Sequence, residues 1–237
     1  MHTFVEALRW IGTSSHWSGF DGIPVRTLEQ IEIFLAAMTI AAVLAIPVGT
    51  YVGHTRKAEF LSVSIANVGR SIPSFALLVI TYLIVNKIAP SKAFGLVPPV
   101  AALVALAIPP MVTNTYVAIQ AIDPDTVEAA RGMGLSEREV LLGLELPLAA
   151  PLVMAGIRTS AVTVIATVPL AALTGGGTLG RYIVDGFAQH DQAKLVAGAI
   201  LVALLSVLTE TTFAALERAI TPKTSSQPRK RPTVAPA

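Results

Sequence analysis

The sequence predicts an all-α membrane protein of about five kinked transmembrane helices, with a cytoplasmic helix-turn-helix loop between spans three and four. Of its 237 residues 53% are hydrophobic and 14% are charged, where a soluble domain has roughly 25% charged residues. Its mean hydropathy is +0.67. Cysteine is absent, which excludes disulfides and thiolate metal sites. The net charge of +2 is small, and its basic excess lies at the C-terminus, which argues against nucleic acid as a partner.

Apolar runs near the roughly 20 residues that a helix needs to cross a bilayer define the spans. They cover about 31–52, 72–85 with an extension on one side, 96–118, 148–173 and 195–216. Several contain proline, which is tolerated in membrane helices where neighbours pair the freed carbonyls: Pro47, Pro109, Pro110, Pro151 and Pro169. Kinked helices are therefore expected.

The spans divide the chain into three parts: an extracytoplasmic segment 1–30, a transmembrane domain 31–217 and a basic, disordered tail 218–237. Phe4, Leu8 and Ile11 recur at helical spacing beside Trp10 and Trp17, which favours an interfacial helix near the N-terminus. A loosely ordered polar leader is the alternative. The tail is rich in proline, serine and basic residues.

Lysine and arginine in the connections predict the orientation, because cytoplasmic loops carry an excess of them. The tail, the first connection and the third connection hold such residues: Arg218, Lys223, Arg229, Lys230 and Arg231, then Arg56, Lys57 and Arg70, then Arg131 and Arg138. With five spans, the C-terminus lies in the cytoplasm and the N-terminus outside. The outward segments also retain several basic residues.

The charged loop 123–147 has the local pattern of two short helices. Asp123 is a good N-cap before Pro124, and the helix that follows is expected to run to Gly134. Ser136 and Glu139 have the spacing of a capping box, which starts a second helix that leads to Pro147. Such a compact unit suits docking of a soluble partner. The alternative is a pair of solvated loop helices with routine charge patterning.

The same loop resembles the EAA signature of permease subunits of binding-protein-dependent ABC importers. The matching residues are Glu128, Ala129, Ala130, Gly134, Leu146 and Pro147, with Leu144 where the signature usually has isoleucine. Other stretches are similar to the branch for glycine betaine, choline, carnitine and related osmoprotectants: "RSIPSFALL", "IPPMVTNTYVAI", "LELPLAAPLVMAGIRTSAV", "GGGTLG" and "AGAILVALL". These pieces fall within about residues 27–216.

The resemblance implies a transport subunit, not an enzyme, that binds no cofactor. Its implied partners are a cytoplasmic ABC ATPase dimer that holds ATP and magnesium, an extracytoplasmic substrate-binding protein and a second permease, identical or homologous. It implies a bacterial or archaeal cytoplasmic membrane. Glu128 is the expected ATPase contact, with Ala129, Ala130 and Gly134 shaping the fit and Leu144 and Pro147 completing the signature. Another small polar solute, such as an amino acid, is the alternative substrate.

Polar residues inside the predicted spans are candidates for the path or its gate. Asn114 suits interhelical hydrogen bonding or a place on the path. Arg158 lies about 15 Å along its span by the helical rise and needs a partner, for which Glu210 is a candidate. Snorkelling to the interface is the alternative for either.

Catalytic and nucleotide-binding patterns are weak. The histidines His2, His16, His54 and His190 are scattered without metal-ligand spacing and are expected to be solvated. "TGGGTLG" lacks the Lys-Ser or Lys-Thr of a phosphate loop, so a tight re-entry or a surface for a docking receptor is expected there, with a plain flexible turn as the alternative. A membrane-embedded enzyme or assembly subunit is the competing class, and it would need intramembrane His, Asp or Glu pairs.

Overall fold

The computed structural model describes residues 2–56 and 72–220. Lys57, Arg70 and the predicted tail from residue 221 onward lie outside them. Within the described residues the chain is helical, with no strand. Its elements are α1 (His2–Gly12), η1 (Ser14–Trp17), α2 (Ile23–Thr55), α4 (Ser74–Ile88), η2 (Pro90–Lys92), α5 (Val97–Gln120), α6 (Pro124–Gly132), α7 (Glu137–Val140), the π-turn η3 (Leu141–Glu145), α8 (Leu146–Thr167), η4 (Val168–Thr174), α9 (Gly180–Gln189) and α10 (Gln192–Ile220).

The prediction of an all-α membrane protein is confirmed. Among the described residues, four helices are long and apolar enough to cross a membrane: Ile23–Thr55, Val97–Gln120, Glu137–Thr174 and Gln192–Ile220. They correspond to the first, third, fourth and fifth predicted spans. The second corresponds to α4, which is apolar and has 15 described residues. At the helical rise, α4 measures about 22 Å, less than the roughly 30 Å of a hydrocarbon core.

The first span begins earlier than predicted. Helix α2 starts at Ile23 with Pro24 in its first turn, so it takes in residues that the sequence had placed in the N-terminal segment. Three polar residues of this added stretch, Arg26, Glu29 and Gln30, have hydrogen-bond partners within the protein. The guanidinium of Arg26 donates to Glu29 at 2.9 Å, and Gln30 is completely buried.

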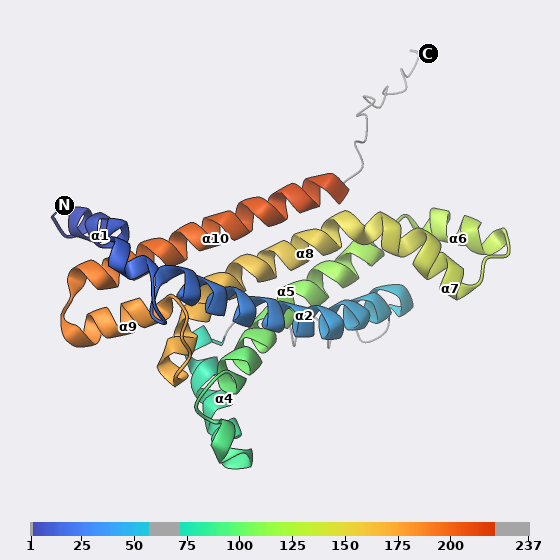
Figure 1. Ribbon diagram of the computed structural model, residues 1–237. Helices are drawn as coiled ribbons and strands as arrows, with labels where there is room; N and C mark the ends of the chain where they lie inside the picture. The colour runs from blue at the N-terminus through green and yellow to red at the C-terminus, as the bar shows by residue number, and fades with distance from the viewer. Residues whose placement is uncertain (1, 57–71, 221–237) are drawn as a thin grey trace, which may run out of the picture.

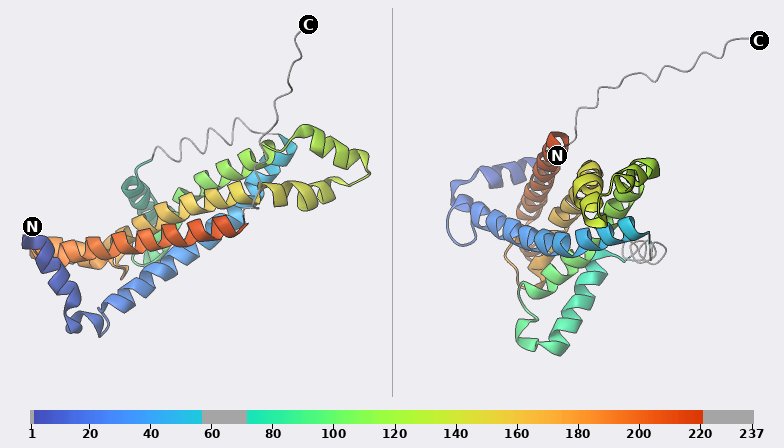
Figure 2. Two further views of the ribbon diagram at one scale, coloured as in Figure 1. Left: turned by 90° about the horizontal axis from the view of Figure 1, so that it is seen from above. Right: turned by 90° about the vertical axis from the view of Figure 1, so that its right-hand side faces the viewer.

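The long helices lie side by side, with α4 projecting from the bundle (Figure 1). The polar pair α6 and α7 forms one end of the molecule, and α1 and α9 lie at the other, as the left view of Figure 2 also shows. The main core joins α2, α5 and α8 and includes Ala37, Met111 and Ile165. Small residues on α2 allow its backbone to approach α5, as at Gly49, where an added Cβ would lie 2.7 Å from Thr115 Cβ.

A helix also forms where the sequence predicts an interfacial one. Helix α1 packs along α10, and its Trp10 meets Tyr182 of α9 edge to face, with ring centroids 5.1 Å apart. The aromatic contact anchors α1 to the bundle. Its position at a membrane interface stays a prediction.

The fourth span changes from α to 3-10 geometry at Val168 because Pro169 has no N–H for the carbonyl of Ile165. Gln30 of α2 supplies the missing hydrogen-bond donor. Its Nε2 donates to the Ile165 carbonyl at 3.3 Å, and its Oε1 accepts from the N–H of Leu179 at 3.2 Å. One buried amide therefore joins α2 to α8 and to the start of α9.

We predict that Gln30→Leu lowers the free energy of unfolding by about 1–3 kcal/mol, because a buried carbonyl and a buried N–H lose their partner. Thermal unfolding of the purified protein in detergent measures this. Gln192→Leu, the same change at an exposed position at the start of α10, is the control. Equal unfolding midpoints for the two variants would contradict the assigned role.

Candidate functional site

The candidate site is the polar hairpin 123–145, which begins with the predicted cap. The side chain of Asp123 accepts a hydrogen bond from the N–H of Asp125 at 3.0 Å, and Pro124 occupies the first turn of α6. Both features were predicted from the sequence and are confirmed. The helix starts with its first free amide paired, so its entry from α5 is fixed.

The turn between the two helices is equally well defined. Helix α6 ends at Gly132, two residues before the predicted Gly134, which adopts a φ of +89° beyond the helix end. The N–H of Gly134 donates to Arg131 O at 2.9 Å and that of Leu135 to Ala130 O at 3.3 Å. These two bonds form a Schellman motif, whose left-handed residue is most easily glycine. The predicted capping box of Ser136 and Glu139 then starts α7.

The residues carried over from the signature fall into two sets. Ala130 is buried with Val127 and Val140, and Leu144 packs against them, so these two residues hold the hairpin together. Glu128 and Ala129 lie on the exposed side of α6. The structure therefore leaves Glu128 and Ala129 accessible to a partner and places Ala130 and Leu144 inside the hairpin.

Pro147 does not end the second helix as predicted. The chain runs as one helical segment from Glu137 to Thr174. The π-turn Leu141–Glu145 lies directly before the proline, and the N–H of Leu146 donates to Leu141 O across it. A proline ring crowds the carbonyl four residues earlier in a regular helix, and a wider turn is one way to accommodate it. The hairpin and α8 are therefore continuous.

His54 at the end of α2 reaches the hairpin, which corrects the expectation of a solvated histidine. Its Nδ1 lies 2.6 Å from Glu145 Oε2, and the two side chains are 15% and 6% exposed. Its Nε2 lies 3.3 Å from Glu137 Oε2. Glu137 also accepts two hydrogen bonds of 2.9 Å from Arg131. These bonds raise the pKa of Arg131, so its guanidinium stays charged.

We call Arg131, Glu137, His54 and Glu145 the loop–α2 network. No local sequence signal indicates it, because His54 and Glu145 are 91 residues apart. The carboxylate of Glu145 within the apolar run "LLGLELP" was the available hint, since a buried acid requires a partner.

Arg158 has the predicted partner and a second one. Its guanidinium is paired with Glu210 and, at 2.9 Å, with Glu217, both on α10. Glu217 lies two turns beyond Glu210, on the same face of the helix. The triad joins α8 to α10, and any role in gating stays a prediction.

Asn114 lies where α5 crosses α8. Its Nδ2 donates to the carbonyl of Pro110 in its own helix at 2.8 Å. A Cβ added at Gly156 of α8 would lie 2.6 Å from Asn114 Cβ, so the glycine makes room for this side chain. Asn114 therefore contributes to the helix crossing by packing, and the hydrogen bond of its Nδ2 stays within α5.

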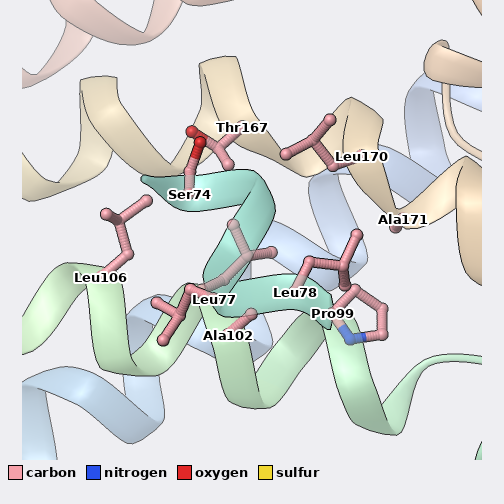
Figure 3. A pocket seen from close by; sticks show the side chains of 10 residues that line it. Ser74, Leu77, Leu78, Pro99, Ala102, Leu106, Thr167, Leu170 and Ala171 are labelled. Atoms are coloured by element: carbon pink, nitrogen blue, oxygen red, sulfur yellow. The ribbon is translucent and has the colours of Figure 1, made fainter. Parts of the chain in front are cut away.

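Figure 3 shows a small cavity where α4 and α5 meet the end of α8 and η4. Its labelled lining residues are Ser74, Leu77, Leu78, Pro99, Ala102, Leu106, Thr167, Leu170 and Ala171. The cavity there is about 10 Å³. A single water needs about that much room. This junction is therefore closed to an organic solute in the present conformation.

A family model described as "Binding-protein-dependent transport system inner membrane component" matches residues 37–222. The choline transport system permease protein OpuBB of Bacillus subtilis is 33% identical over 83% of this chain and 88% of its own length. The glycine betaine/carnitine/choline transport system permease protein OpuCB of the same species is 31% identical over 84% and 88%. The carnitine transport permease protein OpuCB of Listeria monocytogenes is 31% identical over 87% and 91%.

Solved structures show the same fold. An inward-facing conformation of the MetNI methionine ABC transporter matches with a TM-score of 0.72 at 22% identity, over 82% of this chain and 94% of that one. The crystal structure of an amino acid ABC transporter with histidines matches with a TM-score of 0.70 at 14% identity, over 91% and 98%.

We predict that Gly156→Ala lowers the free energy of unfolding by about 1–3 kcal/mol, because its Cβ forces α5 and α8 apart. Gly143→Ala in the same helical segment is the matched control, since an added Cβ there has nothing within 4 Å. Thermal unfolding of both variants in detergent compares them. Equal loss in the two variants would show that the Asn114 contact does not set the helix crossing.

Proposed function

Because the chain belongs to the family of binding-protein-dependent transport system inner membrane components, we propose that it forms the translocation path of an ATP-driven importer for an osmoprotectant. The expected solute is a quaternary ammonium compound such as glycine betaine, choline or carnitine. Three relatives whose names state such solutes, each at least 31% identical over most of the chain, support this class.

The hairpin 123–145 is the observation that carries the proposal. It presents a capped, polar helix at one end of the bundle, and it continues into α8 without a break. A rigid element attached to a membrane helix can transmit a displacement that a flexible loop would absorb. We therefore assign to the hairpin the role of receiving force from an ATPase.

Within the hairpin, Glu128 and Ala129 form the proposed ATPase contact because they are exposed on α6. Ala130 and Leu144 support the contact from inside, Gly134 closes the turn and Pro147 follows the π-turn into α8. Of these six signature residues, two are proposed to meet the partner and four give the hairpin its shape.

In this proposal the chain works with three kinds of partner. A separate ATPase dimer binds ATP and magnesium on the cytoplasmic side, and an extracytoplasmic binding protein delivers the solute. A second permease, identical or homologous, completes the path. Arg158, Glu210 and Asn114 belong, in this proposal, to the gate region, where they hold α8 against α10 and α5.

Uptake measurements test the transport class and the substrate together. We predict that cells lacking this gene lose uptake of labelled glycine betaine, choline or carnitine at high osmolarity, and that the wild-type gene restores it. Glu128→Arg should lower the restored uptake by about tenfold or more, because charge reversal weakens the ATPase contact. Glu6→Arg, a charge reversal at the other end of the molecule, is the control.

Membrane levels of each variant are measured by immunoblotting. Normal uptake with Glu128→Arg would remove this residue from the mechanism. Unchanged uptake of all three solutes in the deletion strain would withdraw the osmoprotectant assignment, and labelled amino acids would then be tried.

The proposed orientation places the hairpin in the cytoplasm and the α9–α10 turn outside. Met133 and Phe187 mark these two ends, with exposed fractions of 76% and 77%. The chain has no cysteine, so a single cysteine can be introduced at either position. We predict that Phe187→Cys reacts with a membrane-impermeant maleimide in intact spheroplasts and that Met133→Cys reacts only after permeabilisation. The opposite pattern would invert the topology.

A further inference from the structure

The end of α2 faces the hairpin across a cavity. This cavity, of about 220 Å³, is lined by Gly53, His54 and Arg56 of α2, by Val127, Glu128 and Arg131 of α6, and by Glu145. Close packing transmits movement between neighbouring elements. Across a cavity the two elements are not in close contact, so packing does not transmit movement between them. Any mechanical link between α2 and α6 at this point depends on side chains that cross the cavity.

The loop–α2 network bridges it. His54 contacts Glu145 at the π-turn and Glu137 at the start of α7, and Glu137 holds Arg131 of α6 with two hydrogen bonds. The two ring nitrogens of His54 therefore face two different carboxylates, Nδ1 that of Glu145 and Nε2 that of Glu137. The 2.6 Å contact between His54 and Glu145 and the two hydrogen bonds from Arg131 to Glu137 hold the three elements in position relative to one another.

The end of α2 that carries His54 is also closely packed against α5. Gly53, adjacent to His54, lies so close to α5 that an added Cβ would be 2.8 Å from Ile119 Cβ. A displacement of His54 therefore displaces the end of α2 against α5. The hairpin is also connected through the backbone to two other helices: to α5 by residues 121–123 and to α8 by the π-turn. The network gives the hairpin a third attachment.

We propose that His54 is a positioning residue that transmits movement of the hairpin to α2, through Glu145 and Glu137, during transport. This inference rests on the proposed function of the hairpin. Without the link, ATP hydrolysis by the partner moves α5 and α8 while α2 lags, and part of the turnover fails to move solute.

The test variant removes the link without leaving a buried charge. His54→Ala alone would leave the carboxylate of Glu145 buried and unpaired, which destabilises the fold. The double variant His54→Leu/Glu145→Met replaces both partners by apolar side chains of similar size, which is close to neutral for stability. Tyr51→Leu, one turn earlier on α2 and 60% exposed, is the control.

The native complex, purified from its own cells through a tag on the permease, is reconstituted in liposomes with its binding protein. Solute uptake and ATP hydrolysis are measured in the same vesicles, with the labelled osmoprotectant that wild-type cells accumulate. We expect the double variant to hydrolyse ATP at close to the wild-type rate and to move at least about fivefold less solute per ATP. Tyr51→Leu should keep the wild-type ratio.

Two results would overturn the proposal. An unchanged ratio would show that α2 needs no link at His54. A parallel fall of uptake and hydrolysis, in proportion to the amount of assembled complex, would assign the network to folding alone. Glu128→Arg in the same vesicles separates this proposal from the preceding one: if its uptake is normal, the function of the hairpin fails, whatever the double variant does.

Discussion

Water is absent from the hydrocarbon core of a bilayer, so each backbone amide and carbonyl there must be paired within the protein. This constraint explains the helical fold. It also explains how the fourth span accommodates the two points where it departs from regular α-helical geometry. Pro169 leaves the carbonyl of Ile165 without its helical partner, and the buried amide of Gln30 pairs it. Before Pro147, a π-turn widens the helix and lets it continue. The fourth span is thus accommodated at both irregular points, by a residue of α2 at one and by a wider turn at the other, and it remains one element from the hairpin to Thr174.

That continuity connects the two ends of the molecule. The hairpin lies at one end and α9 at the other (Figure 1), and α8 passes between them through the main core. Polar side-chain contacts attach this element to its neighbours: Arg158 to α10, and Glu145 to His54 of α2. In the proposed coupling to an ATPase, a displacement of the hairpin is therefore expected to reach α2 and α10 as well as α8.

Local features could be predicted from the sequence, and contacts between distant residues could not. The spans follow from the length of apolar runs, and the caps at Asp123 and Ser136 involve residues two or three positions apart. The pairing of Arg158 with Glu210 was foreseeable because acids are rare in the spans. The contacts of Gln30 with Ile165 and of His54 with Glu145 span 135 and 91 residues, and neither has a local pattern. Pro147 was expected to end the second helix of the hairpin. The helix continues past it because the π-turn directly before the proline accommodates its ring. The roles of Glu128 and Ala129 stay predictions.

The central claim is that a separate ATPase docks on the exposed side of α6. Crosslinking tests it most directly, because the chain has no cysteine of its own. A photoactivatable maleimide is attached to Ala129→Cys in native membranes, with Ala188→Cys at the opposite end of the molecule as the reference, and captured proteins are identified by mass spectrometry. We predict that position 129 captures a protein that binds ATP and that position 188 does not. Capture of the ATP-binding protein from position 188 alone, or of none from position 129 in an actively transporting membrane, would contradict it.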